Sequence, residues 1–146
     1  MQSVVMKFVL SGLYCLVTSV IFAQTPKETV NTFFEALNSK NAEQIEVLMA
    51  DDLKLHSLSI STESKLSSTD KETFINSIKN IGPEVTIEER IFDVESLENN
   101  RIATVWVPYQ FYVNGNFSHE GINVFTMVKI EEVWTITSIT DTRVRK

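Results

Sequence analysis

The side chain best placed for acid/base chemistry is that of His119, which follows the dipeptide Asn114-Gly115 on a predicted strand. His119 shares its parity with Asn123 and Phe125, and side chains of equal parity lie on one face of a strand. This face is the better candidate for a concave pocket, where a histidine acts as a general base or orients a ligand. The alternative is a histidine at a hairpin end that bonds to a backbone group.

A second candidate pair, Asp141 and Arg143, lies on one face of the last predicted strand. The planar guanidinium of Arg143 suits the carboxylate of an anionic ligand. The alternative is a structural ion pair at a strand terminus, which contributes little to stability. If this strand lies beside the one that carries His119, then Asp141 borders the same pocket and orients His119 as the base.

The predicted strands are rich in aromatic residues, and Trp106 and Tyr109 are the two that we expect to line a pocket. Core packing or a dimer interface accounts for most of the others, although Tyr109 or Tyr112 would assist His119 in an enzyme. Pro108 has no N–H for a sheet and predicts an edge or a bulge. The predicted ligand-binding set is the following: Trp106, Tyr109, Tyr112, Asn123 and Arg143.

The sequence contains no motif for a metal site, a phosphate-binding loop or a serine nucleophile. The spacing of His56, Asp51-Asp52 and His119 matches no metal-ligand motif, so we expect neither a metal nor a cofactor. No Gly-rich phosphate loop and no Gly-x-Ser-x-Gly elbow occurs. The acidic pairs, of which Glu88-Glu89 and Glu131-Glu132 are examples, are interpreted as solvated turns and strand edges.

Helices are predicted in the first half of the chain. Thr25 and Glu28 form a capping box for an amphipathic helix that ends near Asn38, and Asn41 caps a shorter helix. A strand follows, with a change of phase around His56 and Ser57 that suggests a bulge. Residues 61–70 are polar and predict a surface loop.

A third helix is predicted to begin with a capping box of Thr69 and Glu72 and to stop at Gly82-Pro83. Everything after it is predicted as strands, because β-branched and aromatic residues become frequent. Asn114-Gly115 is a strong hairpin signal, and Glu131-Glu132 predicts a second tight turn. This order predicts an α+β fold in which helices pack on one face of a curved antiparallel sheet.

The composition predicts one globular domain, with 146 residues, 43% hydrophobic residues and a net charge of −6. The acidic balance argues against a nucleic-acid binder, which needs a surplus of Lys and Arg. The single cysteine, Cys15, allows no disulfide within the chain.

Residues 1–23 have the pattern of a signal peptide, with Lys7, an apolar run and the small residue Ala23 before polar Gln24. The alternative is a signal anchor that stays in the membrane, but the apolar run is shorter than the roughly 20 residues that span a bilayer. We therefore expect cleavage near Ala23, a domain over residues 24–146, no membrane association after cleavage, and a secreted or periplasmic protein.

The order of elements resembles the nuclear transport factor 2-like (cystatin-like α+β) superfamily. The resemblance covers roughly residues 25–143 and is closest to small secreted members described as lumazine-binding or SnoaL-like. It rests on the turn Met49 to His56 and on the following segments of the second half: Trp106-Val107-Pro108-Tyr109, Phe111-Tyr112, Asn114-Gly115, Phe117-Ser118-His119, Gly121, Phe125, Trp134-Thr135-Ile136 and Asp141-Thr142-Arg143.

The resemblance implies a cone-shaped domain whose strongly bent sheet and helices enclose a pocket, often in a homodimer formed through the sheet. Three functions stay open. The first is the binding of a small, partly aromatic or apolar ligand in the cone. The second is an acid/base enzyme of the dehydratase, isomerase or cyclase type that uses His119 with Asp141. The third is a dimerisation module without a ligand.

Overall fold

A computed structural model describes residues 24–145 of the chain, and the predicted signal peptide at residues 1–23 lies outside the described part. The helices are α1 (Pro26–Asn38), α2 (Ala42–Val47) and α3 (Lys71–Lys79). The strands are β1 (Met49–Ile60), β2 (Lys65–Asp70), β3 (Ile87–Ile91), β4 (Glu95–Glu98), β5 (Ile102–Val113), β6 (Asn116–Ile130) and β7 (Val133–Val144). Within residues 24–145, no helix has the length and apolar character needed to cross a bilayer.

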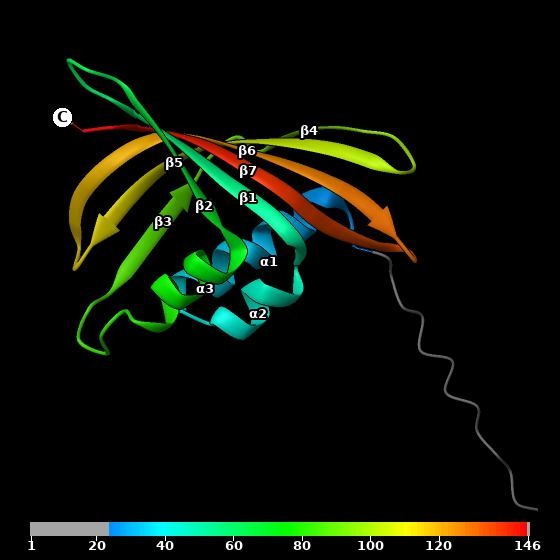
Figure 1. Cartoon of the computed structure of the whole chain (residues 1–146), viewed down its shortest axis with the longest axis horizontal. Coiled ribbons are helices and arrows are strands. Elements are labelled where there is room, and N and C mark those ends of the chain that lie inside the picture. The colour runs from blue at the N-terminus through cyan, green and yellow to red at the C-terminus, as the bar shows by residue number, and fades with distance from the viewer. Residues whose placement is uncertain (1–23, 146) are drawn as a thin grey trace, which may run out of the picture.

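The strands form one strongly bent sheet that arches over the three helices (Figure 1). The strand order is β2-β1-β7-β6-β5-β3, and β4 pairs with β5 as well. The predicted α+β class is confirmed. The sheet is mixed, however, because β1 runs parallel to β7 while the other pairs are antiparallel. The prediction of a wholly antiparallel sheet is wrong at this pair, since the two strands are far apart in the sequence and no turn fixes their direction.

Local capping signals place the helices. Thr25 and Glu28 form the predicted capping box, and the side chain of Asn41 caps α2. The third helix begins one residue later than predicted, because the Asp70 carboxylate, not Thr69, accepts from the backbone N–H of Thr73 at 2.9 Å. An aspartate at this position also interacts favourably with the helix dipole.

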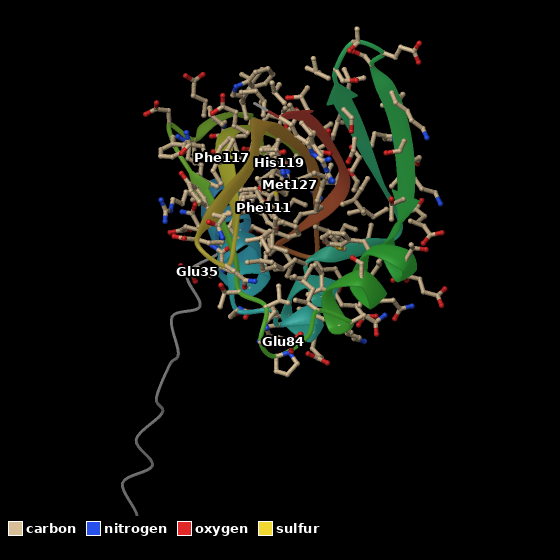
Figure 2. The ribbon with its side chains drawn as sticks, turned by 90° about the vertical axis from the view of Figure 1, so that its left-hand side faces the viewer. Glu35, Glu84, Phe111, Phe117, His119 and Met127 are labelled. Atoms are coloured by element: carbon tan, nitrogen blue, oxygen red, sulfur yellow. The ribbon has the colours of Figure 1, made fainter. Side chains whose placement is uncertain are left out.

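Two predictions around β1 are wrong. Residues 65–70 form β2 instead of a loop, and they pair with β1 between Lys54 and Ser59. This strand is polar because it lies at the edge of the sheet, where most of its side chains are exposed. The tip of the hairpin between β1 and β2 projects beyond the sheet (Figure 2), while β1 itself is paired with β7 as far as Ile60 and Val144. Pairing between β1 and β7 is regular through His56 and Ser57, and its irregularity lies earlier, between Met49 and Lys54.

The two predicted tight turns are confirmed by their backbone angles. Asn114 and Gly115 have φ of 50° and 76°, and Glu131 and Glu132 have φ of 47° and 67°. Two consecutive residues with positive φ match the twist of an antiparallel pair. Pro108 lies where β5 passes from its partner β3 to its partner β4, and its carbonyl accepts a bond from Phe92 N–H at 3.0 Å. The missing N–H of proline is tolerated in this gap.

The core lies between the concave face of the sheet and the helices. Phe125, in the middle of β6, is fully buried, and its ring meets Phe33 and Phe34 of α1 edge to face at 5.3 and 5.6 Å. Such contacts contribute to stability beyond the apolar area that they bury. α1 is therefore anchored against the centre of the sheet, and Phe33 and Phe34 also border the cavity described below.

Candidate functional site

A cavity of about 180 Å³ lies between the concave face of the sheet and the helices α1 and α3. An engineered cavity of roughly 150 Å³ holds benzene, so this one has room for a single ring. Its apolar wall is formed by Phe33, Phe34, Leu37, Leu55, Phe74, Ile78, Ile81, Ile87, Phe111 and Ile139. Its polar groups belong to Glu89, Tyr109, His119, Asn123, Asp141 and Arg143. Figure 2 looks into the open end of the curved sheet, where Phe111 and His119 are labelled.

The register of the sheet brings the polar groups together. Ser57, Asp141 and Asn123 are direct neighbours across β1, β7 and β6. Glu89, Phe111 and His119 are direct neighbours across β3, β5 and β6. Residues opposite each other in paired strands point to the same face. These two sets of neighbouring residues, which come from strands distant in the sequence, therefore face the same side of the sheet, where the cavity lies.

Asp141 is buried, and its carboxylate is occupied by structural donors. Oδ1 accepts from the Ser57 hydroxyl, and Oδ2 accepts from Arg143 Nε at 2.7 Å and from the Tyr109 hydroxyl at 3.3 Å. The Arg143 Nη2 also donates to Ser57 Oγ at 3.1 Å. The Tyr109 hydroxyl lies 2.9 Å from the Thr142 carbonyl oxygen. Burial raises the pKa of Tyr109, and the charge of Asp141 raises it further, so this tyrosine stays neutral.

Glu89 lines the cavity and is not among the residues predicted for the site. Its Oε1 accepts a bond of 2.7 Å from Asn123 Nδ2, and burial, as the main cause, raises the pKa of Glu89 to about 7. The side chain keeps some exposure because it faces the cavity. Within residues 24–145, no ion pair forms to this carboxylate; its charged neighbours are Asp141, which raises its pKa, and Arg143, which lowers it.

The interpretation of Glu88-Glu89 as a solvated strand edge holds for Glu88, which is exposed and pairs with Arg90. It fails for Glu89, which alternation places on the same face as Ile87 and Ile91. An acid between two inward-facing isoleucines is the signal that a parity count of this strand would have found.

His119 lies in the cavity beside aromatic rings. Its ring centroid is 5.0 Å from that of Phe111 and 5.7 Å from that of Tyr109. Burial, with a contribution from the charge of Arg143, lowers the pKa of His119, so the imidazole is neutral at pH 7. Its Nδ1 lies 3.0 Å from Ser118 Oγ. The structure places His119 and Asp141 at one cavity, but within the described chain the hydrogen-bond partner of His119 is Ser118 and not Asp141.

No family model matches this sequence, and no curated protein matches it either. Solved structures do match. A nuclear transport factor 2-like protein from Cytophaga hutchinsonii aligns with a TM-score of 0.64 and 16% identity, over 80% of this chain and 93% of that one. A cystatin-like fold protein of unknown function from Nostoc punctiforme aligns with a TM-score of 0.62 and 13% identity, over 80% and 86%. The chain has the nuclear transport factor 2-like fold.

Other proteins of this fold bear different descriptions. A proposed scytalone dehydratase from Novosphingobium aromaticivorans aligns with a TM-score of 0.63 and 11% identity, over 80% of both chains. Such low identity establishes the nuclear transport factor 2-like fold and not the chemistry, because one fold hosts many functions.

Two residues of the predicted site lie outside the lining of the nuclear transport factor 2-like cavity. Trp106 points to the outer face of the sheet and is 49% exposed. Tyr112 follows an irregularity in the pairing of β5 and β6, packs edge to face on Phe117, and lies under the guanidinium of Arg90. The other five predicted residues all line the cavity. Within residues 24–145, no group of three metal-ligating side chains comes together.

Proposed function

We propose that this protein binds a small organic molecule, with one ring-sized apolar body and one polar group, in the cavity of the nuclear transport factor 2-like fold. The observation that supports it is the meeting of an apolar wall with polar side chains from β3, β5, β6 and β7 at one cavity. A pocket with a mostly apolar lining and a few convergent polar groups is the usual form of a small-molecule site. The cavity volume limits the apolar part to about one ring.

The test is a screen of single-ring compounds by ligand-observed NMR against the wild type and two variants. Ile81→Trp adds a large side chain to the cavity lining, and we expect it to abolish binding. Ile130→Trp makes the same change at an exposed position near the end of β6 and should leave binding intact. The proposal fails if no compound binds, or if compounds bind the two variants equally.

A second candidate function is acid/base catalysis, and one observation favours it. Two groups that can carry protons, Glu89 and His119, face one cavity, and the pKa of Glu89 lies near neutral pH. A general base works best when its pKa lies near the working pH. In this candidate Glu89 takes the role of base, because the carboxylate of Asp141 is occupied by Ser57, Tyr109 and Arg143.

The enzyme candidate is tested by following deuterium exchange at the α-carbon of cyclohexanone in D2O. A base in the cavity removes the α-proton, the resulting carboxylic acid exchanges this proton with D2O, and the α-carbon then takes up a deuteron, so the exchange rate rises above that of the buffer. Glu89→Gln should remove this excess rate, whereas Glu88→Gln, on the exposed side of the same strand, should not. Exchange at the buffer rate would leave binding as the proposed function.

We propose that the protein acts outside the cytoplasm, because residues 1–23 have the pattern of a cleaved signal peptide. The mass of the intact protein recovered from the periplasm or the medium tests this. A chain that begins at or near Gln24 supports the proposal, and a full-length chain retained in the cytoplasm contradicts it.

A further inference from the structure

The acidic groups at the cavity differ in how their charges are balanced. Asp141 is paired with Arg143 at 2.7 Å and receives two further hydrogen bonds from Ser57 and Tyr109. Within the described chain, the Glu89 carboxylate receives one side-chain hydrogen bond, from the neutral amide of Asn123. A carboxylate taken out of water is costly unless it is protonated or meets a positive charge. The cavity therefore contains an acid whose charge the described chain does not compensate.

The charged groups around Glu89 do not supply the missing cation. On its own strand, Glu88 and Arg90 lie on the opposite face and pair with each other at 2.8 Å. From α1, Glu35 lines a separate groove that Glu89 also borders.

The remaining titratable neighbours are across the cavity. From β7, Asp141 and Arg143 are engaged with each other. Tyr109 on β5 and His119 on β6 are neutral at pH 7, because burial raises the pKa of the tyrosine and lowers that of the histidine. Ionisation of Glu89 consequently leaves one negative charge at the cavity without a counter-charge.

The apolar wall suits a cation as well as a ring. Phe33 and Phe74 stack at 6.3 Å, and Phe111 is the direct sheet neighbour of Glu89. The faces of aromatic rings attract cations, most strongly where water is excluded. An anion would meet the carboxylates of Glu89 and Asp141, and the one cation that the described residues contribute to the cavity lining, Arg143, is already paired with Asp141.

We infer that the ligand of this cavity is a single-ring organic amine, bound as a cation whose N–H groups donate to the Glu89 carboxylate while its ring occupies the aromatic wall. The inference rests on the proposed binding function and names the chemical class of its ligand. It makes Glu89 the residue that selects charge, and it assigns Arg143 to the positioning of Asp141.

The experiment compares three probes that share one ring and differ in charge: 2-phenylethylamine, 2-phenylethanol and phenylacetate. Isothermal titration calorimetry at pH 8 measures each with the wild type, Glu89→Gln and Glu88→Gln. We expect the amine to bind the wild type at least tenfold more tightly than the alcohol, and phenylacetate to bind weakest. Glu89→Gln keeps an oxygen for Asn123 but loses the charge, so it should remove the preference for the amine, and Glu88→Gln should keep it.

The pH dependence gives a second measurement. Only ionised Glu89 attracts the amine, and the pKa of Glu89 is raised to about 7. The affinity for the amine should therefore fall by about tenfold between pH 8 and pH 6 in the wild type, with no such fall for the alcohol or for Glu89→Gln.

The outcomes separate this inference from the function on which it rests. If the alcohol or phenylacetate binds the wild type as tightly as the amine, or if Glu89→Gln keeps the preference, the cavity binds small molecules but the inference about the amine is wrong. If none of the three probes binds, both are wrong for single-ring ligands.

Discussion

The side-chain amide of Asn38 makes two hydrogen bonds to the backbone of Glu89. Asn38 Nδ2 donates to the Glu89 carbonyl oxygen at 3.1 Å, and Asn38 Oδ1 accepts from the Glu89 N–H at 2.7 Å. β3 is an edge strand, so no neighbouring strand is available to bond these backbone groups. Asn38, the last residue of α1, supplies the hydrogen bonds that a neighbouring strand would otherwise make. The position of the acid at the cavity thus depends on the end of a helix 51 residues away in the sequence.

We expect Asn38→Ala to destabilise the fold by about 1–2 kcal/mol, because two partly buried hydrogen bonds are lost. Urea denaturation followed by circular dichroism measures this. Asn31→Ala, at an exposed position of the same helix, is the control and should change stability by less than about 0.5 kcal/mol. Equal effects of the two substitutions would show that the bonds to Glu89 do not support the fold.

Stability should depend on pH through Glu89. Burial raises the pKa of Glu89 from 4.5 to about 7, so the folded state holds this proton more tightly than the unfolded state. The resulting contribution is fully present below pH 4.5 and is lost as the pH rises through 7, with a total of about 3 kcal/mol.

Denaturation of the wild type and Glu89→Gln at pH 4.5 and pH 8 measures this contribution. The wild type should lose stability relative to Glu89→Gln over this range, and Glu88→Gln should follow the wild type. A difference between wild type and Glu89→Gln that is constant with pH would contradict the raised pKa.

Gly121 permits a close approach of two strands. A Cβ at this position would overlap the Thr142 carbonyl oxygen, which accepts a hydrogen bond from the Tyr109 hydroxyl. We expect Gly121→Ala to displace β7 and to destabilise the fold by about 2–3 kcal/mol.

Gly82→Ala is the control for this substitution, because the atoms nearest to its new methyl group belong to the flexible end of the Glu84 side chain. Thermal unfolding should separate the two variants clearly. A Gly121→Ala protein as stable as Gly82→Ala would mean that the backbone of β7 adjusts without cost.

His119 should titrate below its ordinary value of 6.5, because burial and the charge of Arg143 both disfavour the imidazolium. Arg143→Gln removes that charge, so we expect the pKa of His119 to rise. An NMR titration of the imidazole protons measures it, with Arg90→Gln as a control that removes an arginine paired with Glu88 on β3. An unchanged pKa of His119 in Arg143→Gln would show that the charge of Arg143 does not contribute to the shift.

We propose that the chain forms the homodimer that the family resemblance implies, through the outer face of the sheet. Ile102, Trp106 and Leu97 are 49%, 49% and 82% exposed on β5 and β4. Burial of such a patch between two chains would exclude water from large apolar side chains. Sedimentation should give a dimer for the wild type and a monomer for Trp106→Asp, whereas Leu66→Asp, an exposed leucine on β2, should stay dimeric. A monomeric wild type would contradict this expectation.

Features with a local cause could be predicted from the sequence. The cap at Thr25 and the turn at Asn114-Gly115 depend on residues within three positions of each other, and both are as predicted. The parity of His119 and Asn123 also placed both at the cavity, since alternation is a local property of a strand.

Features that depend on distant contacts could not be predicted. The polar residues 65–70 form a strand only because β1 offers them an edge, and β1 is parallel to β7 only through the arrangement of the whole sheet. Alternation with Ile87 and Ile91 distinguishes the inner face of Glu89 from the outer face of Glu88, so the placement of Glu89 could have been predicted. Its raised pKa could not, because it depends on burial among several elements that are distant in the sequence.

The place of β7 in the sheet has a consequence for the synthesis of the protein. β7 follows every other described element in the sequence, yet it lies between β1 and β6 and carries Asp141. A chain that emerges N-terminal end first can form α1 and the hairpin of β5 and β6 early. β1 cannot pair with β7, its neighbour in the centre of the sheet, until β7 has emerged. The cavity must therefore assemble late, and until then the apolar faces of β1 and β6 would be available to chaperones.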